Sequence, residues 1–86
     1  MNIPTAQEYK KEVDNQINSG KLTVEQGIIL YQVYLKSLDG IPTNINYLMS
    51  VTGCTWKEIN YLINGLVLRG ALTKVEDKHV ATKGLL

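Results

Sequence analysis

The sequence has little of what disulfide-bonded, metal-centred or membrane-spanning proteins need. It contains one cysteine and one histidine, Cys54 and His79, so an intramolecular disulfide and a cysteine-cluster metal site are excluded. No apolar run approaches the ~20 residues of a membrane-spanning helix, and no basic segment followed by an apolar one opens the chain as a signal peptide would. We expect a cytoplasmic protein with no metal, no cofactor and no membrane contact.

Net charge is also small. Nine Lys and Arg residues stand against eight Asp and Glu residues, which gives +1, whereas a dedicated nucleic-acid-binding domain is often strongly basic. The charge is unevenly divided, because residues 1–40 carry four Lys and five acids, while residues 41–86 carry four Lys, Arg69 and three acids. The two parts therefore have net charges of −1 and +2, an asymmetry that favours a polyanionic partner at the second part.

Groups of residues that would carry out catalysis are missing as well. The sequence shows no paired catalytic carboxylates, no nucleophile with a neighbouring base and no phosphate-binding loop. We therefore expect that the protein is not an enzyme. What is present is the composition of one globular domain, with 44% hydrophobic and 20% charged residues in a chain of 86.

Threonines mark the helix starts. Three of them are followed three residues later by Glu or Gln, the spacing of a capping box, and each precedes a periodic apolar run. Gly20, Gly40 and Gly70 stand where a helix would end in the left-handed conformation. Together with Thr43 or Asn44 as a further cap, these signals predict helices over residues 5–18, 23–38, 44–51 and 55–68.

After Gly70 the pattern changes. The segments ALTKV (71–75) and HVAT (79–82) are β-prone and flank a polar stretch, which predicts a small hairpin. Four helices followed by a hairpin indicate a mainly α fold of the winged helix-turn-helix type, four helices plus a wing. We expect a single winged-helix domain over residues 1–86, with an N-terminal helical pair in 1–40 and the helix-turn-helix and wing in 41–86.

The predicted helix 55–68 has an apolar face and a polar face. Gly53 allows the chain to turn, and Leu48 before the turn and Ile59 and Leu62 after it are placed to hold the two helices together. Ile63 and Leu66 continue this buried stripe. We expect Trp56, in the first turn, to pack at the core or its edge, with contact to a DNA backbone as the alternative.

The polar face carries residue types that read DNA. Lys57, Asn60, Tyr61 and Asn64 follow one another at i, i+3, i+4 and i+7. Asn can bond adenine, Lys can reach guanine or phosphate, and Tyr can touch phosphate or a thymine methyl. In the hairpin, Lys74 and Lys78 are placed to contact the phosphate backbone. A solvated polar face and a charged turn are the alternative interpretation.

These segments resemble the MarR-like winged-helix group of regulators. LTVEQGIILYQVY (22–34) resembles the helix that precedes the family's reading head, and residues 45–72 and HVATKGLL (79–86) resemble its helix-turn-helix and the end of its wing. The resemblance covers residues 22–86 and implies binding to double-stranded DNA, with the polar face of helix 55–68 as the recognition element. The family dimerises through long terminal helices, and since the sequence stops at Leu86 we expect the C-terminal one to be missing.

Helix 23–38 is apolar nearly all round, which is typical of a helix buried on more than one side. One side is expected to face the core, and the other must be covered by helix 5–18 or by another chain. We predict a homodimer formed by the N-terminal helices, with its interface at Ile29, Leu30, Val33 and Tyr34.

Two functions are consistent with these features. The first is a sequence-specific double-stranded DNA-binding protein, a small bacterial or phage transcriptional regulator that reads the major groove with helix 55–68. The second is a winged-helix protein-protein interaction module, a phage or plasmid accessory factor that docks on host machinery without binding DNA. The polar face and basic hairpin favour the first, and the low net charge and apolar helix 23–38 favour the second.

Overall fold

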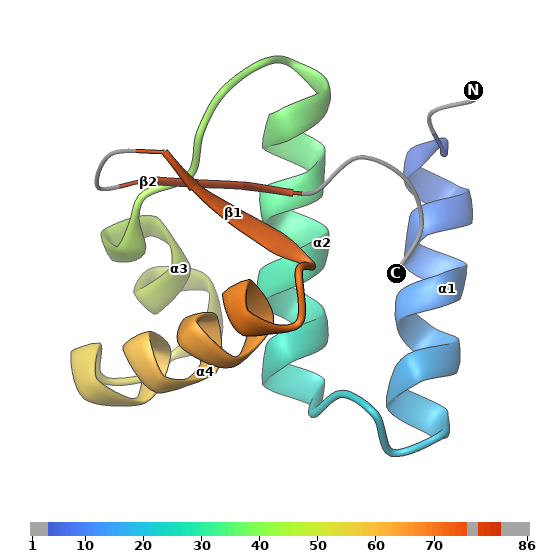
Figure 1. Cartoon of the computed structure of the whole chain (residues 1–86), viewed down its shortest axis with the longest axis horizontal. Helices are drawn as coiled ribbons and strands as arrows, with labels where there is room; N and C mark the ends of the chain where they lie inside the picture. Colours follow the sequence, from blue (N-terminus) through green and yellow to red (C-terminus); the bar gives the residue numbers. More distant parts are fainter. Residues whose placement is uncertain (1–3, 76–77, 82–86) are drawn as a thin grey trace.

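The computed structural model describes residues 4–75 and 78–81, except for the side chains of Lys78, Val80 and Ala81. Its elements are α1 (Ala6–Asn18), α2 (Val24–Leu38), α3 (Ile45–Thr52), α4 (Trp56–Leu68), β1 (Leu72–Val75) and β2 (Lys78–Ala81) (Figure 1). The prediction of a mainly helical chain with a small hairpin is confirmed, and each helix begins and ends within one residue of its expected bounds. Among the helices in this part of the chain, none has the length and apolar character that crossing a bilayer requires.

The helix starts follow the expected capping chemistry. At α1, α2 and α4 the cap threonine accepts a hydrogen bond from the N–H three residues later, and the Glu or Gln at that position accepts one from the threonine N–H. Helix α3 is capped by Asn44, whose side chain accepts from the Tyr47 N–H at 2.9 Å. A cap of this kind stabilises a helix by about 1 kcal/mol, so the helix boundaries are fixed by local interactions.

Helix α2 lies at the centre of the molecule. Figure 1 shows α1 along one side of α2, with α3, α4 and the hairpin on the other side. Contacts join α2 to α1, α3, α4 and β2. One apolar cluster runs through these elements and forms the core: Tyr9, Val13, Leu22, Ile29, Leu30, Val33, Tyr34, Leu48, Ile59, Ile63, Leu66, Ala71 and Leu72.

The side chains predicted at a homodimer interface belong to this core: Ile29, Leu30, Val33 and Tyr34. Each is at most 3% exposed within a single chain, so the predicted interface is wrong. The physical reason is that the chain's own elements cover both apolar sides of α2, α1 on one side and α3, α4 and β2 on the other. The most exposed apolar side chains of α2 are Val24, Ile28 and Leu38, which are 57%, 36% and 46% exposed.

Gly27 allows α1 and α2 to approach each other closely. A Cβ atom at this position would lie 2.5 Å from Cδ1 of Ile17 and 3.1 Å from Cγ1 of Val13. Any larger residue would therefore displace the α1 side chains that pack on α2. The close helix contact that glycine permits at this position is thus made within the chain.

Two tyrosines hold Pro4 and α1 against α2. The rings of Tyr9 and Tyr34 are stacked, with centroids 3.8 Å apart and planes 2° from parallel. The Tyr34 hydroxyl donates to the carbonyl of Pro4, whereas the buried Tyr9 hydroxyl has no hydrogen-bond partner within residues 4–75 and 78–81. Burial, and then the neighbouring Tyr34, raise the pKa of Tyr9 to about 12.

This difference predicts opposite effects for two matched substitutions. Tyr34→Phe leaves the Pro4 carbonyl without its donor and is expected to lower the free energy of unfolding by about 1 kcal/mol. Tyr9→Phe removes a buried hydroxyl that has no partner, so stability is expected to stay the same or rise. Urea unfolding of the two variants checks this, and a Tyr9→Phe variant less stable than Tyr34→Phe would contradict it.

Candidate nucleic-acid interface

Helices α3 and α4 are joined by a three-residue turn, 53–55. Gly53 ends α3 in the left-handed conformation with φ 74°, and its N–H donates to the Met49 carbonyl at 2.9 Å. Nothing lies within 4 Å of the place of a Gly53 Cβ, so glycine is favoured here by the backbone conformation and not by lack of space. Thr55 then caps α4, which redirects the chain within one short turn, as the sequence predicted.

The apolar side chains expected to hold α3 and α4 together are mostly in the core. Leu48, Ile59 and Leu66 have no exposed surface, and Ile63 is 2% exposed. Leu62 is half-buried and packs at the edge of this cluster. Helix α4 is therefore fixed by one face, and its opposite face is left to solvent.

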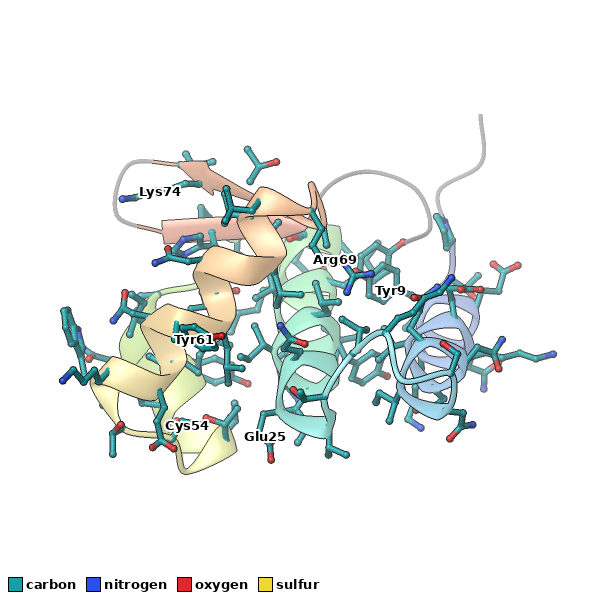
Figure 2. The ribbon with its side chains drawn as sticks, turned by 60° about the horizontal axis from the view of Figure 1, so that its bottom comes forward. Tyr9, Glu25, Cys54, Tyr61, Arg69 and Lys74 are labelled. Atoms are coloured by element: carbon teal, nitrogen blue, oxygen red, sulfur yellow. The ribbon has the colours of Figure 1, made fainter. Side chains whose placement is uncertain are left out.

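The solvent-facing side of α4 carries what we call the outer line: Lys57, Tyr61, Asn64 and Leu68. These residues follow one another at intervals of four, three and four, so at about 100° per residue they share an arc of about 60° and extend over about 16 Å of helix. All four are exposed, Tyr61 by 79% and Leu68 by 88%. Three of the side chains predicted to face DNA thus lie together, with Tyr61 on the outward surface of α4 in Figure 2.

Asn60, the fourth predicted reading residue, lies at the edge of this face. It is half-buried, and its amide nitrogen donates to the Trp56 carbonyl at 2.8 Å. Its side chain is therefore partly engaged by its own helix and is less available to a ligand than Asn64.

Sequence reasoning missed two exposed apolar side chains of α4. Leu68 follows Asn64 by four residues, so the helical spacing of the outer line could have predicted its exposure. Trp56 was expected to pack but is 63% exposed, so this prediction is wrong. The reason is that α4 meets the core only from Ile59 onward, almost one turn later.

The acid on α4 is engaged in the cap of its own helix. Glu58 accepts from the Thr55 N–H at 2.9 Å, and its hydrogen bonds with the Thr55 backbone and side chain lower the pKa of the carboxyl. Glu58, Lys57 and Tyr61 of α4 line a cleft of about 650 Å³ together with Cys54 and with Glu25 of α2. This flank of α4 therefore carries two carboxylates and one lysine, and Figure 2 shows Glu25 and Cys54 on it.

The opposite flank of α4 faces the hairpin. Lys74 is exposed on β1, and in Figure 2 it lies on the other side of α4 from Glu25. The other predicted wing residue, Lys78, is paired with Val75 through the backbone, and its side chain lies outside the described part of the structure. Arg69, after α4, donates to the Lys21 carbonyl at 2.7 Å and thereby ties the end of α4 to the loop between α1 and α2.

A buried histidine fixes the hairpin against the start of α3. The N–H of Thr43 donates to the His79 carbonyl at 2.8 Å, and the His79 N–H donates to the Thr43 carbonyl at 2.9 Å. Both residues are almost fully buried, at 1% and 4% exposed. Neither Thr43 Oγ1 nor His79 Nδ1 has a hydrogen-bond partner in the described residues. Burial, followed by the nearby Lys74, lowers the pKa of His79.

Comparison of the chain with protein-family models, with curated proteins and with solved structures finds no match. No group of three or more His, Cys, Asp or Glu residues that could hold a metal ion occurs among residues 4–75 and 78–81. The candidate interface is thus described only from the exposed residues of α4 and the hairpin in this structure.

The lowered pKa of His79 predicts acid sensitivity. A folded state that keeps His79 neutral binds fewer protons than the unfolded chain below the ordinary pKa of 6.5, so the free energy of unfolding falls as pH drops through that value. His79 is the single histidine of the chain, which assigns the effect to one group. Urea unfolding between about pH 5 and 8 measures how the free energy of unfolding changes with pH. His79→Gln is expected to remove this pH dependence. The same dependence in the variant and in the wild-type protein would show that His79 is not its origin.

Proposed function

We propose that this protein binds double-stranded DNA as a small regulator, with α4 in the major groove and the hairpin against the phosphate backbone. The observation that carries the proposal is the outer line of α4, which a helix-turn-helix arrangement leaves facing solvent. Its Lys and Asn are donors suited to base edges and phosphates. The carboxylate of Glu58, which would repel DNA, is held in the cap of α4.

The arrangement of the elements supports a winged-helix interpretation of the fold. Thr43 bridges to His79 ahead of α3, and α3 and α4 are followed directly by the antiparallel pair β1 and β2. In this interpretation β1 and β2 are the wing, and the exposed Lys74 is one of its phosphate contacts. The resemblance to MarR-like regulators leads to the same placement of α4.

A direct test uses Trp56, the single tryptophan of the chain, as a fluorescent reporter in the first turn of α4. Titration with sheared genomic DNA at low salt is expected to change its emission, and the affinity is expected to fall steeply as salt is raised. Lys57→Gln is expected to weaken binding by roughly 1 kcal/mol. No binding at low salt, where even non-specific affinity is measurable, would reject the function.

Lys11→Gln is the matched control for Lys57→Gln. It removes the same charge from an exposed position on α1, and α1 lies on the far side of α2 from α4 (Figure 1). Equal losses of affinity in the two variants would indicate a general charge effect and not an interface on α4.

A homodimer is part of the proposal, because two α4 helices about 34 Å apart would match a pseudo-palindromic site. Its interface would lie outside the buried core residues of α2. Sedimentation equilibrium is expected to show a dimer, and a monomer at high micromolar concentration would remove this element without affecting DNA binding by one chain.

The second candidate is a protein-contact module, favoured by the exposure of Trp56, Tyr61 and Leu68. Exposed Trp and Tyr are enriched among the residues that dominate protein interfaces. A complex of this kind would depend much less on salt than a DNA complex does.

A further inference from the structure

The chemistry of the outer line bears on which base pairs α4 would read, an inference that rests on the proposed function. The strongest specific contact to guanine is a bidentate arginine or lysine, and the outer line has no arginine and a single lysine, Lys57. Its other members are an amide, Asn64, and two apolar or aromatic side chains. An amide matches adenine, and apolar groups match the C5-methyl group of thymine.

Tyr61 could meet DNA through its ring or through its hydroxyl, and the surroundings favour the ring. The cleft that Tyr61 lines holds the carboxylates of Glu25 and Glu58 and one cation, Lys57, so its net charge is negative and would disfavour a phosphate strand on that flank. Lys74 lies on the opposite flank (Figure 2), so a phosphate strand is attracted there. This leaves the Tyr61 ring, 79% exposed, pointing at the floor of the groove.

Leu68 has the same orientation on the outer line. It is 88% exposed, so this apolar side chain packs very little against residues 4–75 and 78–81. Lys57 and Leu68 are about 16 Å apart along α4, which corresponds to about five base steps of 3.4 Å. A helix lying along the groove would therefore reach several consecutive base pairs with this line.

We propose that α4 recognises A·T-rich duplex through thymine methyl groups, with Tyr61 and Leu68 packed on two of them and Asn64 bonded to an adjacent adenine. Lys57 then supplies charge, and the phosphate strand nearest the hairpin lies against Lys74. The two apolar side chains are specificity determinants of the interface.

The test compares a 30-base-pair mixed A/T duplex with the same duplex in which uracil replaces every thymine. This change removes the methyl groups and keeps every hydrogen-bonding group. Each lost methyl contact is expected to weaken binding by about fourfold, from ~0.8 kcal/mol per buried carbon, so the wild-type protein should prefer the thymine duplex by on the order of tenfold. Because any effect of uracil on duplex shape is common to all variants, the ratio of the two affinities is compared between them.

Four variants assign the contacts. Tyr61→Ala and Leu68→Ala are each expected to reduce the thymine-to-uracil ratio by about fourfold, whereas Tyr61→Phe, which keeps the ring, should leave it unchanged. Leu38→Ala is the matched control, because Leu38 is also the last residue of its helix and is 46% exposed. It should keep the wild-type ratio. Thermal unfolding verifies that all four variants are folded, as expected for exposed positions.

The outcomes separate the two proposals. Binding to both duplexes with equal wild-type affinity would overturn methyl recognition and leave DNA binding intact. A Tyr61→Phe variant that binds as weakly as Tyr61→Ala would place the contact at the hydroxyl and would also overturn it. No binding to either duplex at low salt would overturn the DNA function itself, and a salt-insensitive protein complex at α4 would then take its place.

Discussion

The burial of α2 on two sides is the constraint on which the rest of the structure depends. Its side chains Ile29, Leu30 and Val33 have no exposed surface, and each such side chain contributes about 1.5–3 kcal/mol when removed from water. α1 packs on one side of this helix, and α3, α4 and β2 on the other. Without α2 the remaining elements would have no common surface to pack against.

This arrangement places the candidate interface at the edge of the molecule. Since α4 is held through Ile59, Ile63 and Leu66, its outer line is fixed by the same contacts that build the core. The bridge between Thr43 and His79 and the bond from Arg69 to the Lys21 carbonyl add two fixed points. The position of the α4 face is therefore set by the core and by these two contacts.

The two flanks of α4 differ in charge. Glu25 and Glu58, together with Lys57 of the outer line, line a cleft on one flank of α4, and Lys74 lies on the other flank, so a polyanion would be attracted more on the hairpin side. The net charge of +1 conceals this local asymmetry. The local arrangement of charges around α4 therefore says more about how a polyanion would approach this face than the total charge does.

The sequence by itself determined the helix boundaries, because capping depends on residues three positions apart and on no distant contact. It also placed Lys57, Tyr61 and Asn64 on one face of α4, since helical spacing is equally local. Only the tertiary structure decided that both apolar sides of α2 are covered within one chain, that Trp56 stays exposed, and that His79 pairs with Thr43. Those features depend on contacts between segments far apart in the chain. The sequence alone does not show whether an apolar side chain packs against another element or is exposed to solvent.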